Sequence, residues 1–242
     1  MSRTRIVEPE ILDVLAPSDP RAQRSRRDLK RINGVMLQVP IMARLLRSLP
    51  PPRRVLEIGC GDGTFLLSLL PRLPEWRGTH IVLLDKSPIV TTETMKAFAG
   101  AGRQVEVAAA DVFDYLTPAP RERFDLIVAN LFLHHFEDAR LEELLACVAG
   151  WTNAFVACEP ERSAFALYAA RMLWALGCNA VTRHDAVVSV RAGFRGNELS
   201  VLWPRTRNWI AHDDHTLFTH TFIATPSISC ATPLLKEPGS VV

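Results

Sequence analysis

The stretch VLEIGCGDGTF, residues 55–65, decides how the rest of the chain is interpreted. Glu57 interrupts its apolar first half. Glycines then follow at every second position, at Gly59, Gly61 and Gly63. Glycine costs backbone entropy on folding, so three glycines within five residues need a physical reason. The usual reason is that something approaches the backbone closely, which predicts a tight turn that receives a ligand at the end of a strand.

Apolar segments alternate with helix-like segments from residue 53 onward. The apolar runs lack strict alternation, as is typical of parallel strands that helices cover on both faces. The strand-like segments are 53–59, 79–85, 103–111, 123–130 and 153–159, and the helix-like segments are 64–73, 89–102, 137–150 and 161–177. This repetition predicts a doubly wound, Rossmann-like α/β domain of five β/α units.

Two more strand-like segments lie near the C-terminus, at 208–214 and 215–225. The charged residues His212, Asp213 and Asp214 predict the turn between them. A hairpin of this kind adds an antiparallel edge to a mostly parallel sheet, which brings the expected number of strands to seven.

The ends of the chain differ in composition from its middle. Residues 1–20 contain prolines and little periodicity, which predicts a loose lead. Residues 21–48 carry apolar side chains at spacings of three and four, which predicts helix. We therefore expect an N-terminal helical lead or lid at 1–48, a ligand-binding domain at 49–225 and a disordered tail at 226–242.

Composition and charge exclude several classes of protein. The chain is 48% apolar and 22% charged, as in ordinary globular proteins, and its net charge of +2 does not indicate a nucleic-acid partner. The basic cluster at 21–31 fits a solvated helix face better than a phosphate-binding arm. Five cysteines without a CxxC spacing predict neither a disulfide frame nor a zinc site. The sequence shows neither a membrane span nor a signal peptide, so we expect a cytoplasmic protein.

Two nucleotide-binding motifs compete for the glycine stretch, and neither fits it. The dinucleotide motif G-x-G-x-x-G requires a third glycine where Thr64 stands, and the phosphate loop requires a lysine that the stretch lacks. A carboxylate two residues before the first glycine repels a pyrophosphate and attracts a cation. The pattern E-x-G-x-G-x-G therefore favours a ligand with ammonium and sulfonium groups over NAD.

VLEIGCGDGTF resembles the first motif of the class I S-adenosylmethionine-dependent methyltransferases, and the later segments follow in that family's order. The resemblance covers about residues 30–225 and implies the seven-stranded methyltransferase fold, with S-adenosylmethionine as cofactor. It implies that Asp85 in VLLDKS binds the ribose hydroxyls and that Asp111 in AAADVF faces the adenine. The cofactor-binding residues that it implies are Glu57, Gly59, Cys60, Gly61, Gly63, Asp85, Lys86, Asp111, Val112, Asn130 and Leu131. Lys86 departs from the family, which more often has an apolar residue there.

The fourth strand ends in VANLFLHHF (128–136), which resembles the LHH form of small-molecule methyltransferases. The resemblance implies that this end lies under the methionyl group, so His134 and His135 are candidate catalytic residues. His184 beside Asp185 is a third candidate, although a helix cap explains that pair better. Methyl transfer from a sulfonium disperses positive charge and requires no metal, so we predict no metal site.

The acceptor is expected to be a hydrophobic small molecule. The segment NLFLHH lacks the NPPY-like loop of enzymes that methylate adenine or glutamine. The apolar residues in the N-terminal helix and in 161–204 would form a hydrophobic lid. A phenolic, quinone-precursor or polyketide-like compound methylated on oxygen or carbon fits best. Two alternatives stay open: an S-adenosylmethionine-binding accessory protein without catalysis, and a nicotinamide-dependent oxidoreductase. The sequence assigns no role to Arg191 or to the segment 198–204.

Overall fold

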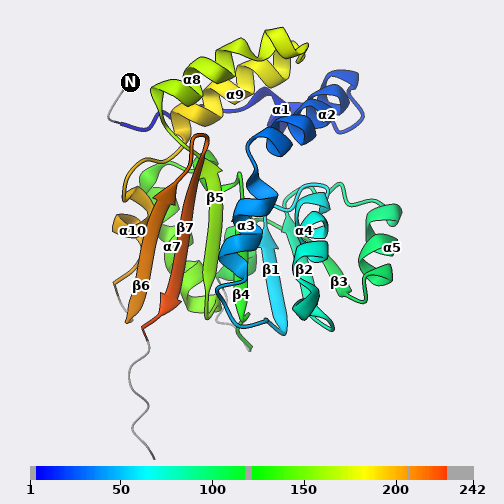
Figure 1. Cartoon of the computed structure of the whole chain (residues 1–242), viewed down its shortest axis with the longest axis vertical. Coiled ribbons are helices and arrows are strands. Elements are labelled where there is room, and N and C mark those ends of the chain that lie inside the picture. Colours follow the sequence, from blue (N-terminus) through cyan, green and yellow to red (C-terminus); the bar gives the residue numbers. More distant parts are fainter. Residues whose placement is uncertain (1–3, 118–121, 206–207, 228–242) are drawn as a thin grey trace, which may run out of the picture.

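A single seven-stranded sheet runs through the computed structural model, which describes residues 4–117, 122–205 and 208–227 (Figure 1). The strand order is β3-β2-β1-β4-β5-β7-β6. The strands are β1 (Arg54–Ile58), β2 (His80–Asp85), β3 (Gln104–Ala109), β4 (Leu126–Asn130), β5 (Phe155–Pro160), β6 (Trp209–His215) and β7 (Thr219–Pro226). The first five are parallel, whereas β7 pairs antiparallel with both β5 and β6. The predicted mostly parallel sheet with an antiparallel C-terminal hairpin is confirmed.

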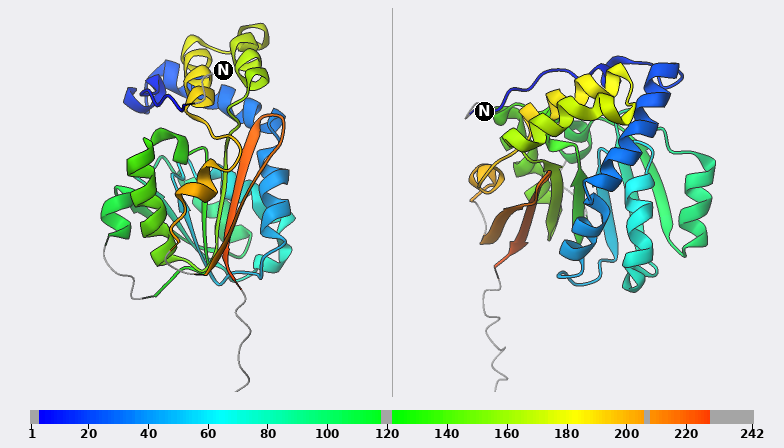
Figure 2. Two further views of the ribbon diagram at one scale, coloured as in Figure 1. Left: turned by 90° about the vertical axis from the view of Figure 1, so that its left-hand side faces the viewer. Right: turned by 45° about the horizontal axis from the view of Figure 1, so that its top comes forward.

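Helices cover both faces of this sheet (Figure 2). Apolar residues of β1 alternate between two buried clusters: Leu56 packs in one with Leu144, and Val55 packs in the other with Leu66 and Phe98. The helices that contribute to the first cluster are α6 (Val112–Leu116), α7 (Asp138–Trp151) and α10 (Glu198–Leu202), and those of the second are α3 (Gln38–Leu46), α4 (Thr64–Leu69) and α5 (Thr92–Gly100). The described residues also form short 3-10 turns, η1 (Leu70–Arg72), η2 (Pro74–Trp76), η3 (Leu133–His135) and η4 (Met172–Leu176), the last of which packs against α8.

A third group of helices lies beyond the carboxyl ends of the parallel strands (Figures 1 and 2). It comprises α1 (Ile11–Val14), α2 (Pro20–Val35), α8 (Ala164–Arg171) and α9 (Ala180–Ala192). Within it, α9 packs against α1, α2 and α8. In an open α/β sheet this is the edge where ligands bind. Among the described residues, none of the helices has the length and apolar character needed to cross a bilayer.

The expectation of a loose lead over residues 1–20 is wrong for its described part, because Arg5 ties the lead to the body of the protein. The Arg5 side chain is 4% exposed. Its guanidinium donates hydrogen bonds to the carbonyl oxygen of Ala192 at 2.8 Å and to Asp138 at 2.7 Å, and it lies 4.2 Å from the centre of the Phe194 ring. The lead has no apolar periodicity and is docked instead by this one buried arginine. No pattern in the sequence therefore indicates the docking.

The turn predicted at residues 212–214 is also wrong, because these residues lie inside β6. Asp213 stays in the strand because it accepts hydrogen bonds from the Ser200 amide at 2.9 Å and pairs with His220 of β7 at 2.7 Å. The hairpin instead turns between His215 and Thr219, where the Thr216 amide donates to the Thr219 carbonyl oxygen at 2.8 Å.

Other boundaries differ from the predictions for local reasons. The helix expected over 21–48 divides into α2 and α3 at Leu37, whose backbone is left-handed with a φ of 56°. The pair His184–Asp185 lies within α9 and does not cap that helix, since Asn179 caps it by accepting from the Thr182 amide at 2.8 Å. Most of the tail predicted at 226–242 lies outside the described residues.

The segment from Arg191 to Trp203 closes the core at the β5–β7 side of the sheet. A side chain at Gly193 would place its Cβ 2.3 Å from the Pro160 carbonyl oxygen, so only glycine fits against the end of β5. Trp203 stacks on Phe155 with ring centres 5.6 Å apart. The segment 198–204 therefore serves packing, whereas the Arg191 side chain is 40% exposed and lies 3.9 Å from Glu8.

Candidate functional site

The glycine turn between β1 and α4 lies at the carboxyl edge of the sheet. Glycine stands at its three positions for different structural reasons. A Cβ at Gly59 would meet the Phe132 ring at 2.2 Å, and one at Gly63 would meet Leu83 at 2.9 Å. A Cβ at Gly61 would meet nothing within 4 Å, and the φ there is 54°. Gly59 and Gly63 therefore leave room for neighbouring side chains, whereas the backbone at Gly61 faces open space.

Asp85, at the end of β2, holds the glycine turn in shape. Its Oδ2 accepts a hydrogen bond from the Gly61 amide at 2.9 Å, and its Oδ1 accepts one from the Ser87 amide at 2.8 Å. The Gly61 carbonyl oxygen in turn accepts from the Ile89 amide at 3.0 Å. The carboxylate thus positions the turn, and its predicted contact with a ribose stays a prediction.

Asp111 follows β3 and caps α6, because its side chain accepts from the Phe113 amide at 2.9 Å. Val112 is the first residue of that helix and is buried. The Lys86 ammonium lies 3.8 Å from Asp111, and its side chain is 80% exposed. This cap is compatible with an adenine contact, which stays a prediction.

Two side chains at this edge have buried oxygen atoms that lack a hydrogen-bond partner. Glu57 in β1 is 2% exposed, and Asn130 ends the neighbouring strand β4. Glu57 Oε2 and Asn130 Oδ1 make no hydrogen bond within the described part of the chain. Buried polar atoms are normally paired, so two unpaired acceptors on adjacent strands indicate a ligand that supplies donors.

Burial raises the pKa of Glu57 to about 8, and the nearby charges of Asp62 and Asp85 add to that shift. The side chain is therefore mostly protonated at neutral pH until a cation approaches it. Burial likewise raises the pKa of the Cys60 thiol, with Glu57 and Asp85 adding to the effect. Cys60 contributes its backbone to the turn rather than a thiolate.

The backbone after β4 is strained at Leu131, whose φ is 53°. Residues other than glycine rarely adopt this conformation, and strain of this kind gathers at functional sites. The turn that follows is η3, whose amides face Glu159 at the end of β5: the Phe132 and Leu133 amides donate to Glu159 Oε1 at 3.0 and 2.9 Å. A fully buried carboxylate therefore sets the path of the LHH segment.

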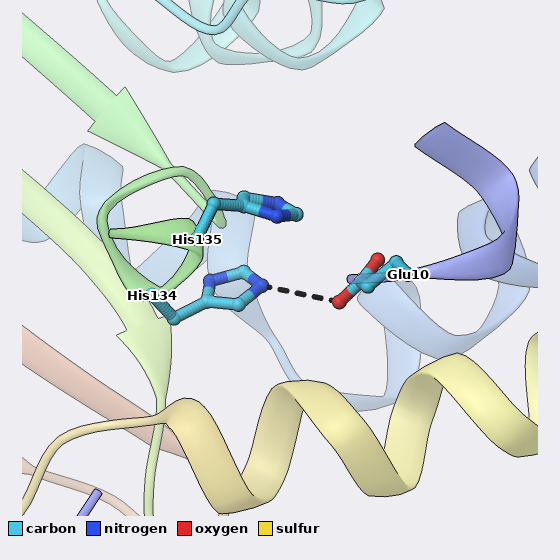
Figure 3. A group of neighbouring side chains, drawn as sticks. All are labelled: Glu10, His134 and His135. Atoms are coloured by element: carbon cyan, nitrogen blue, oxygen red, sulfur yellow. Dashed lines mark ion pairs between the residues drawn. The ribbon is translucent and has the colours of Figure 1, made fainter. Parts of the chain in front are cut away.

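His134 and His135 lie side by side in η3, with ring centres 4.3 Å apart (Figure 3). His134 is 3% exposed, its Nδ1 lies 2.7 Å from Glu159, and its Nε2 lies 3.4 Å from Glu10. Burial lowers the pKa of His134, but its contacts with Glu10 and Glu159 outweigh burial and raise that pKa to about 9. Both of its ring nitrogens are thus occupied by carboxylates.

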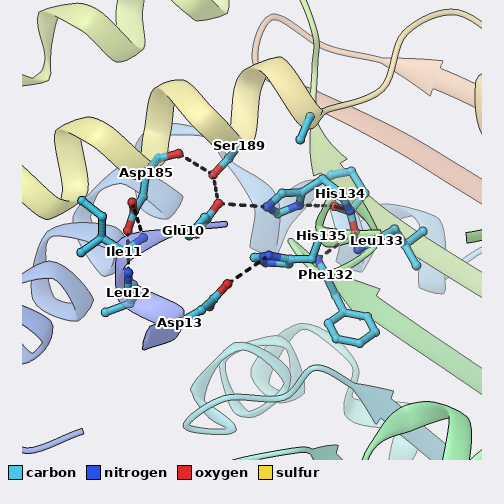
Figure 4. Close-up of polar contacts among 12 residues, drawn as sticks. Glu10, Ile11, Leu12, Asp13, Phe132, Leu133, His134, His135, Asp185 and Ser189 are labelled. Atoms are coloured by element: carbon cyan, nitrogen blue, oxygen red, sulfur yellow. Dashed lines mark hydrogen bonds and ion pairs between the residues drawn. The ribbon is translucent and has the colours of Figure 1, made fainter. Parts of the chain in front are cut away.

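The lead reaches this histidine pair from the far end of the sequence (Figure 4). Asp13 lies 3.4 Å from His135 Nδ1. Asp185 of α9 accepts hydrogen bonds from the amides of Ile11 and Leu12 at 2.9 and 3.0 Å, which fixes the start of α1. Glu10 and Asp13 are site residues that sequence reasoning missed, since nothing in a short, nonperiodic lead indicates what it will contact.

His184 is placed apart from this pair. Its half-exposed ring lies on α9, 3.0 Å from its neighbour Asp185. The structure therefore brings two of the three candidate histidines together and pairs the third with the residue that anchors the lead. The catalytic roles of all three stay predictions.

Helix α2 leans over the glycine turn, where the Lys30 ammonium lies 2.8 Å from Asp62. Asp62 also accepts from the Thr64 amide at 3.0 Å, at the start of α4. A hollow of about 400 Å³ opens beside this ion pair. Its lining comes from α2 and from the loops next to the turn, namely Pro17, Gln23, Arg26, Arg27, Lys30, Asp62, Ile89 and Thr91.

Comparison with known proteins agrees with this site. A family model described as a methyltransferase domain matches residues 55–154. The malonyl-[acyl-carrier protein] O-methyltransferase of Paenibacillus sp. (strain JDR-2) is 32% identical over 104 residues, which are 43% of this chain and 37% of that protein. The trans-aconitate 2-methyltransferase of Acidovorax sp. (strain JS42) is 34% identical over 95 residues, or 39% of this chain and 32% of that protein. The chain thus spans roughly a third of the length of these curated relatives.

Among solved structures, the plantazolicin methyltransferase BpumL in complex with SAH superposes with a TM-score of 0.64. The two chains are 14% identical, and the superposition covers 87% of this chain and 92% of that one. At this identity the likeness shows the fold alone, which is the seven-stranded sheet described above. Residues 55–154 therefore match a methyltransferase domain, and they lie in a fold that this chain shares with a methyltransferase solved in complex with SAH.

Proposed function

We propose that this protein transfers the methyl group of S-adenosylmethionine to an oxygen or carbon atom of a hydrophobic small molecule. The observation that carries the proposal is the bare backbone of Gly61, which faces open space beside the unpaired oxygen atoms of Glu57 and Asn130. A ligand with a cationic amino acid part fits these groups, because it brings N–H donors and positive charge to buried acceptors.

When bound, S-adenosylmethionine supplies an electrophilic methyl group. The protein's own contribution is mainly to hold the two reactants in line, which is worth about 7–11 kcal/mol in well-oriented reactions. A general base adds roughly 10²- to 10⁴-fold, or about 3–5 kcal/mol. The site has rigid parts that can position the reactants. Asp85 fixes the glycine turn, and Glu159 fixes the segment from Phe132 to His134.

The hydrophobic acceptor is supported by apolar side chains in the helical layer over the sheet. Large apolar residues rarely gather on the surface without a partner. Those exposed on α8 and η4 are Phe165, Tyr168, Met172, Trp174 and Leu176.

We also place the protein in the cytoplasm, since the cysteines of the described residues are free thiols.

A second candidate acceptor is a carboxylate. The hollow beside the glycine turn is lined by Arg26, Arg27 and Lys30, which suit an anion. Two relatives are named for malonyl-[acyl-carrier protein] and trans-aconitate, both of which carry carboxyl groups. Methyl ester formation would then replace methylation of a phenol or a carbon acid.

A turnover assay tests the proposal. The chain is incubated with S-adenosylmethionine labelled in its methyl group and with two acceptor panels, phenolic or polyketide-like compounds and small di- and tricarboxylates. We expect label in an organic product of the first panel. Transfer only to carboxylates would select the second candidate, whereas tight cofactor binding without transfer to either panel would support a non-catalytic accessory protein.

A further inference from the structure

We propose that Glu10, His134 and His135 form a binding site for a divalent transition metal such as Zn²⁺, with Asp13 at its edge. The metal-binding atoms of the first three residues all lie within 4.8 Å of one another (Figure 3). They come from two elements that are far apart in the sequence, the start of α1 and η3. The assignment departs from the sequence analysis, which predicted no metal site.

The distances fit a small four-coordinate ion. Zinc lies about 2.0–2.2 Å from imidazole nitrogen and carboxylate oxygen, so two tetrahedral ligands lie about 3.4 Å apart. The contact between His134 Nε2 and Glu10 Oε1 has this length, 3.4 Å, as does the contact between His135 Nδ1 and Asp13. The two histidine rings lie against each other, tilted by 32°, and both turn toward Glu10 (Figure 3). The ligand atoms of Glu10, His134 and His135, which lie within 4.8 Å of one another, would move closer together around an ion.

The surroundings of His134 match those of a metal ligand. Histidines that bind metals almost always donate their other ring N–H to a carboxylate, a backbone carbonyl or water, which fixes the ring and its tautomer. Glu159 provides that carboxylate, 2.7 Å from His134 Nδ1, and is itself held by the Phe132 and Leu133 amides. On the other side, the Ser189 hydroxyl donates to Glu10 (Figure 4). The second layer of the site is therefore already built.

Two imidazoles and one carboxylate select the ion by chemistry. Imidazole suits zinc and other late first-row divalent metals, whereas magnesium prefers carboxylates, carbonyls and water. Three protein ligands also leave a position for water or for an oxygen atom of the acceptor. The bound ion would fasten the lead to the LHH turn at the edge where the acceptor enters. In this arrangement the two histidines are ligands, so they do not accept a proton from the acceptor.

The test is metal binding by the full chain after removal of metals with a chelator. Co²⁺ serves as a spectroscopic probe, and Zn²⁺ and Mg²⁺ are titrated by calorimetry. We expect one Co²⁺ or Zn²⁺ per chain, with the visible absorption of four-coordinate cobalt and no displacement by Mg²⁺. Glu10→Gln and His135→Ala should each weaken binding at least tenfold, and Glu159→Gln should weaken it about 10- to 100-fold. His212→Ala, which removes an exposed histidine of β6, is the matched control and should bind as the unmodified chain does.

Circular dichroism checks that each variant is folded, and Glu10→Gln and His135→Ala change residues that are partly open to solvent. Equal affinity of these two folded variants and the unmodified chain would overturn the site. So would the absence of stoichiometric binding of both Zn²⁺ and Co²⁺ to the unmodified chain. The readouts are independent of methyl transfer, so the metal site and the proposed reaction can fail separately.

Discussion

The Gly61 amide donates a hydrogen bond of 2.9 Å to Asp85, and this contact joins the turn after β1 to the end of β2. Because Ile58 pairs with both Leu84 and Ala129, the ends of β1, β2 and β4 meet at one edge of the sheet. The unpaired oxygen atoms of Glu57 and Asn130 lie on two of these strands. The geometry concentrates the predicted cofactor-binding groups on three adjacent strand ends.

Gly61→Val should abolish binding of S-adenosylhomocysteine, because it places a side chain where the backbone faces open space. Gly78→Val is the matched control: Gly78 also has a positive φ, of 77°, with nothing within 4 Å of its Cβ position, and it lies in the turn before β2. Both variants should lose about 1–2 kcal/mol of stability from the left-handed backbone. Calorimetry should show loss of binding in the first only, and equal binding by both would refute the ligand-facing role of Gly61.

Glu57 makes cofactor binding depend on pH. Its pKa of about 8 keeps it mostly protonated at pH 7, and a bound cation favours the carboxylate and lowers that pKa. Binding of S-adenosylmethionine should therefore release up to one proton, and affinity should increase as the pH rises toward 8. Calorimetry in buffers of different ionisation enthalpy measures the proton count, with Glu57→Gln as the control that releases none. Proton uptake, or equal release by the variant, would contradict the contact.

The same group lowers the stability of the free protein at alkaline pH. The folded-state pKa of Glu57 lies above the ordinary value of 4.5, so unfolding releases its proton, and stability falls as the pH rises from 4.5 to about 8. The cost reaches on the order of 5 kcal/mol above pH 8. Glu57→Gln should remove this loss and unfold at higher denaturant concentration than the unmodified chain at pH 9. A variant that is less stable at pH 9 would show that the carboxylate is not buried without a partner.

His220 fastens the C-terminal hairpin to the sheet. It is fully buried between Asp213, at 2.7 Å, and Glu161, at 3.2 Å. Burial lowers the pKa of His220, but these two contacts outweigh burial and raise it to about 9. The imidazolium therefore stabilises the fold fully below pH 6.5, and its contribution, about 3 kcal/mol, is lost as the pH rises through 9.

His220→Gln keeps the hydrogen-bonding ability of this side chain but not the charge. It should destabilise the protein strongly at pH 6, since removing one partner leaves Asp213 and Glu161 buried without compensation. The difference from the unmodified chain should shrink between pH 6.5 and 9. Urea unfolding at several pH values measures it, and a difference that does not change with pH would mean that His220 is neutral in the fold.

Arg5 should hold the lead in place. Arg5→Ala removes hydrogen bonds to Ala192 and Asp138 and the contact with the Phe194 ring. Hydrogen bonds from charged groups contribute about 1.5–3 kcal/mol each, so the variant should be destabilised by at least that amount. Arg24→Ala, at an exposed position of α2, is the control. Limited digestion with a glutamate-specific protease, for which the lead offers Glu8 and Glu10, should cleave the lead of the first variant faster, and equal rates for both variants would show that the lead is not docked through Arg5.

The sequence predicted the parts of the molecule that short-range patterns determine. The parallel strands β1, β2, β4 and β5 are mostly buried runs, and the E-x-G-x-G-x-G pattern predicted a turn that lies between β1 and α4. Long-range polar contacts were not predictable: nothing near Glu10 indicates that it meets His134, and nothing near Asp213 indicates that His220 keeps it inside a strand. The sequence also could not show that Gly59 and Gly63 serve internal packing. The side chains that they leave room for, Phe132 and Leu83, belong to other parts of the chain.

Calorimetric titration with S-adenosylhomocysteine and, separately, with NADH tests the central claim most directly. The bare turn at Gly61, beside the acidic Glu57 and bound to Asp85, should accept the first ligand with one site per chain and reject the diphosphate of the second. Binding of S-adenosylhomocysteine that is lost in Gly61→Val is the predicted result. Preference for NADH, or no binding of S-adenosylhomocysteine by the folded chain, would contradict the account.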